Sequence, residues 1–223
     1  FQGKSCLFHF IINENQKNET PNIEEYLQEI APQSTLTVIE PHEEGPVFTA
    51  LFAPIASAET PVIISYCDFT VEWSFQNFIR SVEGYDGAIS AFQGFHPASF
   101  GDTYFAYMKV SENQELIALR EKQSFTDSRE NEPASTGIYY FKTFSIFKKY
   151  AQILLNQNNR QLPEAYVSLV FDLMLRDGLR ITAPKVDKFI CLGTPQDLEQ
   201  YNYWYQYFKG QPKLPSKTKN GCL

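Results

Sequence analysis

The sequence predicts an α/β protein whose mixed, mostly parallel sheet is flanked by helices, and three features support this prediction. Short apolar runs rich in β-branched residues alternate with stretches that have helical spacing. The run from Pro61 to Tyr66 is almost continuously apolar, as expected for a strand buried on both faces, and an acid, Asp68, follows two residues later. The chain has 223 residues, of which 43% are hydrophobic, which is enough for one large domain.

The first third of the chain alternates strand and helix in the order that produces parallel strand pairs. The runs CLFHFII, TLTVI and VIISY predict strands over residues 6–12, 35–39 and 62–66. Helical spacing predicts helices over residues 22–30 and 46–58, and Pro46 suits a first turn because the N–H it lacks has no partner there. Since helices connect these strands, we expect the strands to be parallel.

The rest of the chain predicts a hairpin, four strands and four helices. The hairpin is expected over residues 103–121, because two strand-like runs flank the polar stretch 111–114. Strands are expected over 87–93, 136–141, 180–183 and 188–192, and helices over 73–81, 144–157, 164–177 and 196–208. We assign residues 1–208 to a single domain and residues 209–223 to a polar, basic tail.

Charge and composition exclude several classes of function. The net charge is −7, which argues against nucleic-acid binding through a basic surface. No apolar run is long enough to cross a membrane or to serve as a signal peptide, so we expect no membrane partner. The cysteines match no zinc or disulfide pattern. Cys6, Cys67 and Cys191 lie in apolar runs, which predicts buried thiols and a cytoplasmic location.

Several residues stand where a binding site could form, and each also has a simpler structural explanation. Asp68 is equally consistent with a turn cap and with a ligand for a hard divalent cation. Gly45 precedes a helix, so it could serve a tight turn or a close approach to a ligand. Glu121 and Lys122 end a strand, and adjacent opposite charges are usually solvated. Glu164 is an acid in the first turn of a predicted helix, which the helix dipole favours.

The histidines and the aromatic stretch favour structural roles. His9, His42 and His96 are scattered and form no catalytic arrangement, and His9 is expected to be a core histidine. The stretch YNYWYQY, residues 201–207, has helical spacing and no interleaved basic residues. This pattern favours helix packing over base stacking.

Six short segments carry a resemblance to a known family. They are EEGPVFTALFA, PVIISYCDFTVEW, REKQ, STGIYYFK, PEAYVSLVFD and LGTPQDLEQYNYW, which begin at residues 43, 61, 120, 135, 163 and 192. Their order resembles the sugar-1-phosphate nucleotidyltransferase family, in the branch that makes precursors of bacterial capsules and cell-surface polysaccharides. The similarity runs from residue 6 to residue 204. It implies a Rossmann-like α/β nucleotidyltransferase fold.

The resemblance implies an NTP-dependent enzyme. Such an enzyme transfers a nucleoside monophosphate from an NTP to a phosphorylated acceptor, a sugar 1-phosphate or a similar compound, and releases pyrophosphate. Both reactants are anions, so the barrier comes largely from their repulsion and their positioning. Relatives often self-associate, which makes a homo-oligomer an open expectation.

The resemblance assigns roles on the acceptor side of the site. Asp68 would bind Mg²⁺, Lys122 would hold the acceptor phosphate, and these two residues would be the catalytic pair. Glu121 would bind the acceptor hydroxyls and Glu164 would line the same pocket. Gly137 would let the acceptor approach the backbone.

On the nucleotide side, the resemblance places Glu44, Gly45 and Thr49 near the base. Many relatives carry a second metal-binding aspartate at the position of Cys191, whose thiol is a poor magnesium ligand. Asp187 lies four residues earlier and is the substitute that we expect.

One part of the family pattern is absent from this chain. Relatives begin with a strand, a glycine-rich loop that cradles the triphosphate and an arginine, whereas this chain begins where their second strand should be. Absence of that central strand would expose two sheet edges. We therefore expect that the chain as given does not catalyse the full reaction.

Two other functions remain open. A catalytically silent relative could bind a nucleotide without turnover; Cys191 favours this function, whereas Asp68, Glu121 and Lys122 oppose it. A metal-dependent glycosyltransferase of similar topology is the other alternative. Such enzymes usually carry Asp-x-Asp at the strand end, and here Asp68 is followed by Phe and Thr.

Overall fold

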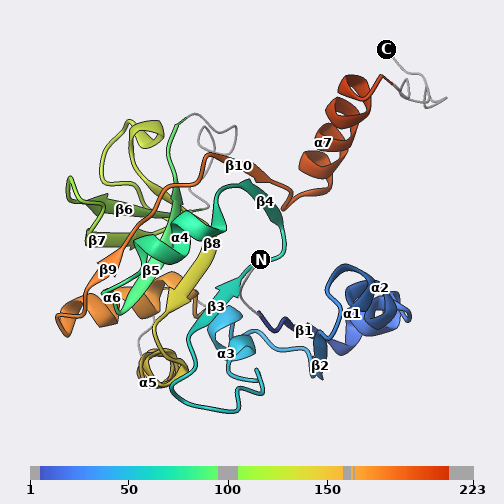
Figure 1. Cartoon of the computed structure of the whole chain (residues 1–223), viewed down its shortest axis with the longest axis horizontal. Helices are drawn as coiled ribbons and strands as arrows, with labels where there is room; N and C mark the ends of the chain where they lie inside the picture. The colour runs from blue at the N-terminus through green and yellow to red at the C-terminus, as the bar shows by residue number, and fades with distance from the viewer. Residues whose placement is uncertain (1–5, 95–104, 158–161, 163, 211–223) are drawn as a thin grey trace.

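The computed structural model describes residues 6–94, 105–157, 162 and 164–210. The chain forms a six-stranded mixed sheet with helices on both faces and a separate two-stranded parallel sheet (Figure 1). This architecture confirms the α/β class with a mixed sheet flanked by helices. His96 and most of the expected tail lie outside the described residues.

The main sheet is built around one long strand. Its strands are β3 (Val62–Ser65), β5 (Gly87–Phe92), β6 (Ala106–Val110), β7 (Leu116–Glu121), β8 (Ala134–Phe141) and β9 (Ile181–Thr182). The order is β7-β6-β8-β5-β9, and β3 pairs with the second half of β8. The expected hairpin is confirmed as β6 and β7, which pair antiparallel.

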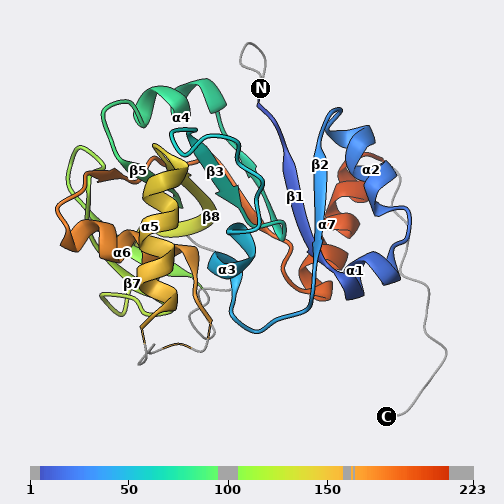
Figure 2. The same cartoon turned by 90° about the horizontal axis from the view of Figure 1, so that it is seen from below.

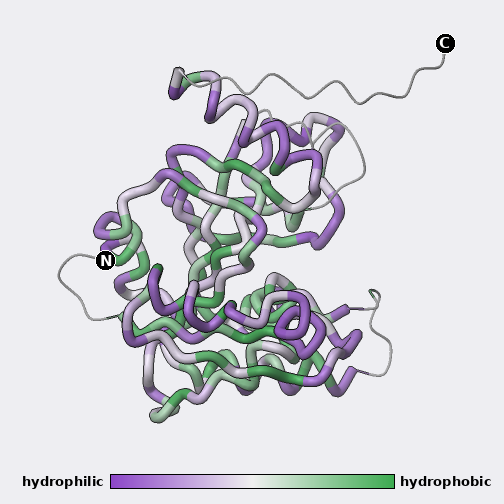
Figure 3. The backbone as a smooth tube through the Cα atoms, turned by 90° about the vertical axis from the view of Figure 1, so that its right-hand side faces the viewer, coloured by the Kyte–Doolittle hydropathy of each residue, from purple (hydrophilic) through white to green (hydrophobic). Residues whose placement is uncertain are grey.

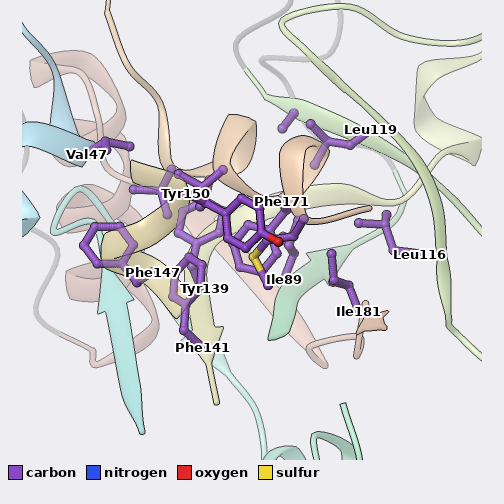
Figure 4. Packing of buried hydrophobic residues seen from close by; sticks show 14 of the residues in the cluster. Val47, Ile89, Leu116, Leu119, Tyr139, Phe141, Phe147, Tyr150, Phe171 and Ile181 are labelled. Carbon is purple, nitrogen blue, oxygen red and sulfur yellow. The ribbon is translucent and has the colours of Figure 1, made fainter. Parts of the chain in front are cut away.

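Side chains that alternate along the strands bury both faces of the main sheet. On one face, Ile89, Tyr139 and Phe141 pack against α5 (Phe144–Leu155) and α6 (Val167–Arg176), as Figure 4 shows. On the other face, Ala88 and Tyr140 pack against α4 (Phe75–Ser81). The period of two along each strand therefore explains why helices cover both faces.

The first two strands form a separate unit. The strands β1 (His9–Asn13) and β2 (Thr35–Ile39) pair in parallel, and α1 (Glu14–Glu19) and α2 (Ile23–Ile30) connect them. Figure 2 shows this unit beside the main body. Among the described residues, β1 pairs only with β2 and β3 pairs only with β8, so each strand has one edge without a strand partner.

A two-stranded ribbon and a final helix complete the fold. The strands β4 (Phe69–Glu72) and β10 (Lys188–Cys191) pair antiparallel. The helix α7 (Pro195–Phe208) follows, and Thr194 and Asp197 form a capping box at its start. Figure 1 shows α7 projecting from the body, and no residue of α7 is buried.

The sheet differs from the expectation in the share of parallel pairs. Only β1–β2 and β5–β9 are parallel among the described strand pairs, and the others are antiparallel. The expectation assumed that each helix joins neighbouring strands. Instead β2 and β3 belong to different sheets, and hairpin-like returns build the rest of the main sheet.

Several local expectations are also corrected. The helix α3 (Pro46–Ala50) ends eight residues before the expected Ala58, where turns and an extended stretch follow. Cys6 and Cys67 are exposed rather than buried, and Cys191 is half-buried. Within the described part of the chain, no helix combines the length and the apolar character that a membrane crossing needs.

Candidate functional site

A cleft of about 580 Å³ lies at the carboxyl ends of β1 and β2. Because these strands are parallel, both of their carboxyl ends meet at this edge, which is where ligands bind in α/β sheets. Its walls come from the ends of the two strands, from the turn before α3 and from the segment before α6. The lining residues are Ile11, Ile12, Asn13, Gln16, Ile39, His42, Glu43, Gly45, Pro46, Thr49 and Glu164.

Gly45 is a glycine for a geometric reason. Its φ of 91° lies in the left-handed region, and a Cβ there would stand 2.7 Å from the backbone N of Ala165. The amide of Ala165 donates to the carbonyl of Glu44 at 2.9 Å, and the amide of Val47 donates to the carbonyl of Ala165 at 3.0 Å. The turn is therefore fixed against the segment that precedes α6.

His42 orients Thr49 at the wall of the cleft, a role that the sequence did not reveal. The backbone amide of Glu44 donates to His42 Nδ1 at 3.2 Å. The proton of a neutral imidazole is then on Nε2, which lies 3.0 Å from Thr49 Oγ1. Thr49 and Glu43 line the cleft, whereas Glu44 is not among the lining residues.

Glu121 and Lys122 are each hydrogen-bonded to another side chain and are not simply solvated. Ser168 donates a short hydrogen bond to the Glu121 carboxylate, and burial raises the pKa of Glu121 above its ordinary value. Lys122 has a φ of 53°, a left-handed conformation that is uncommon for a lysine. Its Nζ donates to the Tyr166 hydroxyl at 2.5 Å, and this bond raises the pKa of Lys122.

Two tyrosines lie behind Glu121. The hydroxyl of Tyr66 accepts from the amide of Val167 at 3.3 Å, and the hydroxyl of Tyr139 accepts from Ser135 at 3.1 Å. Burial raises the pKa of both tyrosines well above the ordinary value, so both remain protonated. Their hydroxyl groups give Glu121 polar neighbours in a region that is shielded from solvent.

Gly137 lies between the tyrosines and the aspartate turn. Its φ is 93°, and a Cβ would stand 2.9 Å from Phe69 Cε1 and 3.2 Å from Tyr66 Cδ2. Its carbonyl accepts from the amide of Tyr66 at 3.0 Å. The glycine is therefore required by these rings, whatever else approaches it.

Asp68 lies on the exposed turn between β3 and β4. Its carbonyl accepts from the amide of Leu192 at 2.7 Å, and its Oδ2 is 3.1 Å from the position that a Cβ on Gly193 would take. The thiols of Cys67 and Cys191 are close enough for the Asp68 charge to raise their pKa, after the larger effect of burial. A thiol is in any case a soft ligand that suits magnesium poorly.

Asp187 lies too far from Asp68 for the two carboxylates to bind one metal ion. The ribbon pairs Lys188 with Glu72 and Cys191 with Phe69, so the two aspartates lie at its opposite ends. At about 3.4 Å per residue, the five residues between their positions correspond to about 17 Å along the ribbon, too far for one ion. The expected strand 188–192 forms as β10, but its antiparallel pairing with β4, which the sequence did not reveal, keeps Asp187 at the end away from Asp68.

The donor set nevertheless fits magnesium at Asp68. Magnesium is commonly held by one or two carboxylates, with water and substrate phosphates as the other ligands. Asp68 offers an exposed carboxylate of that kind. Within residues 6–94, 105–157 and 164–210, no group of three acidic, histidine or cysteine side chains could hold an ion without further ligands.

One segment connects several of the expected residues, although Asp68, Glu121 and Lys122 are not among the residues that line the cleft. Glu164 lines the cleft, Tyr166 accepts from Lys122, and Ser168 donates to Glu121. Glu164 was expected in a helix, but α6 begins only at Val167 because the preceding residues bond to the Gly45 turn. Tyr166 and Ser168 were not foreseen, because their partners Lys122 and Glu121 lie more than 40 residues earlier in the sequence.

The comparisons with known proteins place the fold. The chain matches no family model and no curated protein. It is similar to the solved structure of a nucleoside-diphosphate-sugar pyrophosphorylase from Vibrio cholerae RC9, with a TM-score of 0.71 and 17% identity over 88% of this chain and 80% of that one.

Two further solved structures are similar. The inositol-1-phosphate CTP transferase from T. maritima has a TM-score of 0.62 and 13% identity, over 97% of this chain and 79% of that one. A UDP-glucose pyrophosphorylase complexed with UDP-glucose has a TM-score of 0.65 and 11% identity, over 90% and 81%. At these identities the similarity shows a shared fold.

Proposed function

We propose that this chain is a nucleotidyltransferase domain that transfers a nucleoside monophosphate from an NTP to a phosphorylated acceptor and releases pyrophosphate. The proposed acceptor is a sugar 1-phosphate or a similar small phosphate, activated for surface polysaccharide synthesis in the cytoplasm. The similar solved structures are named for such transfers, and the six sequence segments resemble the same family.

The observation that carries this proposal is the segment Glu164–Ser168. It contributes Glu164 to the cleft and supplies the partners of Lys122 and Glu121. Its backbone also bonds to the Gly45 turn at 2.9 and 3.0 Å. A nucleotide in the cleft and an acceptor beside Lys122 would thus be bound against the same short stretch of backbone.

The side chains have chemistry suited to the two substrates. The ammonium of Lys122 is positioned by Tyr166 and would attract the acceptor phosphate, whose oxygen forms the new bond to the α-phosphorus while the bond to pyrophosphate breaks. Glu121, held by Ser168, would accept hydrogen bonds from acceptor hydroxyls. Thr49 would contact the nucleotide in the cleft. Magnesium bound at Asp68 would screen the charge of the phosphates.

Calorimetric titration with each of the four common NTPs in the presence of magnesium tests the proposal. We expect one NTP to bind, and Asp68→Ala to weaken that binding at least about tenfold, or by 1.4 kcal/mol. Asp187→Ala is the matched control, because it removes an exposed carboxylate at the other end of the same ribbon and should leave binding unchanged.

Pyrophosphate release with a panel of phosphorylated acceptors then separates the alternatives. Release that needs both substrates supports the transferase. Binding without release, also in a chain extended at its N-terminus, would favour a silent nucleotide-binding relative, and consumption of an NDP-sugar would favour a glycosyltransferase. If none of the four NTPs binds, the proposed function is wrong.

A further inference from the structure

The helix α7 carries an aromatic stripe that the described residues leave largely exposed. The stripe consists of Leu198, Tyr201, Trp204, Tyr205 and Phe208, which recur at the i, i+3, i+4, i+7 spacing of one helix face. Trp204 is 52% exposed and Phe208 is 79% exposed. The sequence predicted that these rings pack the helix, and the structure leaves them in contact with solvent.

The stripe is ordered and presents a groove. Tyr201 stacks on Tyr205 with ring centroids 6.1 Å apart, and Trp204 stacks on Phe208 at 6.0 Å. With Ile190 these rings line a groove of about 350 Å³. Figure 3 shows little green along α7 because its hydropathy scale counts tyrosine and tryptophan as slightly polar, although their ring bodies are apolar.

The charges of α7 are placed symmetrically about the middle of the stripe. At 100° per residue, Asp197 and Lys209 fall on the same side of the helix as the stripe, one at each end. Tyr203 is midway between them, six residues from each. An antiparallel copy centred near this point therefore sets each Asp197 against the other copy's Lys209 and each Leu198 against the other copy's Phe208.

We propose that α7 is a self-association helix and that a second copy of this chain covers its stripe through an antiparallel, two-fold symmetric helix pair. Such an interface is self-complementary in both apolar contacts and charge. In this antiparallel pair, the positive end of each helix macrodipole would also lie beside the negative end of the other, which is favourable. This inference does not rest on the proposed function, since α7 contributes no residue to the cleft.

The available area predicts a weak dimer. Aromatic side chains present ~150–250 Å² each, so the exposed part of the stripe is on the order of 400–500 Å² per copy. Two copies would bury roughly 800–1,000 Å², at the lower limit for a specific interface. The pair should therefore form and separate with protein concentration.

A membrane surface is a less suitable partner. Helices that lie on membranes carry lysine or arginine along the polar face, whereas the polar positions of α7 are occupied by Glu199, Gln196, Gln200, Asn202 and Gln206. Among the described residues, the cation at the end of the stripe is Lys209, which belongs to the charge pairing described above.

Sedimentation velocity of the full chain over a concentration series tests the proposal. We expect the apparent mass to rise from 25.7 kDa towards twice that value. The double variant Trp204→Glu/Phe208→Glu should raise the dissociation constant at least about tenfold. The control is Gln196→Glu/Gln206→Glu, which adds the same two charges at polar positions on the opposite side of the helix and should leave association intact.

The outcomes separate clearly. A far-ultraviolet spectrum and a melting curve establish that each variant is folded. The variant Lys209→Glu tests the charge pairing alone: its association should weaken severalfold at low salt and less at high salt. A chain that remains monomeric at all concentrations, a dimer that survives Trp204→Glu/Phe208→Glu, or sedimentation with anionic vesicles without self-association would each overturn the proposal.

Discussion

The main sheet and the β1–β2 unit are built from similar sequence patterns and reach different degrees of burial. All six residues of β5 are buried, and four residues of α5, which packs on the main sheet, are buried as well. In contrast, all five residues of β1 are only half-buried, and α1 and α2 contain no buried residue. Apolar strands and amphipathic helices therefore bury their apolar faces only where a second layer covers them.

This difference matters because the cleft lies where the two regions meet. Asn13 and Ile39 come from the less buried unit, whereas Glu164 precedes a helix of the main body. Local stability follows burial, so the β1–β2 unit should open at a lower free energy than the main sheet. A ligand in the cleft would contact both regions and stabilise the weaker one.

The largest predicted effect contrasts one phenylalanine from each region. Phe171 is fully buried and stacks on Phe141 with centroids 4.6 Å apart, so Phe171→Ala should lower the free energy of unfolding by about 3–5 kcal/mol. Phe10 in β1 is half-buried, and Phe10→Ala should cost roughly 1 kcal/mol. Urea denaturation measures both values.

Equal costs for the two substitutions would break the comparison. They would mean that β1 is covered in solution as completely as α6, by residues that the structure does not describe or by a partner. Nucleotide binding of each folded variant provides a second measurement, since only Phe10 belongs to a strand that lines the cleft.

The second prediction concerns the glycine turn that joins the two regions. Gly45→Ala should cost about 2–3 kcal/mol, because an alanine would combine a strained φ with a clash against Ala165, and nucleotide binding should fall with it. Gly84 has a similar φ of 81° but no atom within 4 Å of the added Cβ. Gly84→Ala therefore isolates the strain and should cost roughly 1 kcal/mol.

A result in which Gly45→Ala costs no more than Gly84→Ala would show that the Ala165 segment yields easily. The two regions would then be less firmly joined than the hydrogen bonds at 2.9 and 3.0 Å indicate. Unfolding by urea and titration with the bound NTP measure stability and binding on the same samples.

Local patterns predicted much of the fold. The apolar run before Asp68 forms β3, the polar stretch between two strand-like runs turns the β6–β7 hairpin, and Thr194 caps α7. Each of these features depends on neighbours in the sequence. Gly45 stood out because it precedes a helix, and Gly137 only through the family resemblance; their positive φ values now explain why each is a glycine.

What the sequence could not predict depends on contacts between distant residues. Tyr166 is 44 residues from Lys122, and Ser168 is 47 from Glu121, so no local pattern connects them. The separation of Asp187 from Asp68 required the pairing of β4 with β10. The exposure of α7 was equally hidden, since helical spacing shows which residues share a face but not what covers that face.

The third prediction uses the pH response of the main body. Ser168→Ala removes the hydrogen bond that opposes the effect of burial on Glu121, so the pKa of Glu121 should rise further above the ordinary 4.5. The folded protein then binds this proton more tightly than the unfolded chain, and stability falls as pH rises through that pKa. We expect a loss of about 1–2 kcal/mol at neutral pH and less in acid, measured by urea denaturation.

The double variant Ser168→Ala/Glu121→Gln is the control, because its neutral amide has no proton to bind or release in this range. Its stability should show no part of this pH dependence. A loss for Ser168→Ala that is equal at all pH values would mean that the hydroxyl serves packing and does not stabilise the carboxylate.

The smallest predicted effect tests whether the β1–β2 unit responds to pH in the opposite sense. His9 reaches across to β2, with its ring nitrogens 2.5 and 3.0 Å from the hydroxyls of Thr35 and Thr37, and burial lowers its pKa below 6.5. The folded unit therefore binds this proton less tightly than the unfolded chain, so its contribution is present above pH 6.5 and is lost as pH falls below that value. Because the side chain is half-exposed, solvent screening keeps the effect to roughly a few tenths of a kcal/mol. Hydrogen exchange of the β2 amides, corrected for intrinsic rates, should show faster opening in acid for the native chain and no such change for His9→Gln. If the opening rate changes with pH in the same way in both proteins, His9 is not the cause of that change. The prediction that the two regions respond to pH in opposite senses would then be wrong.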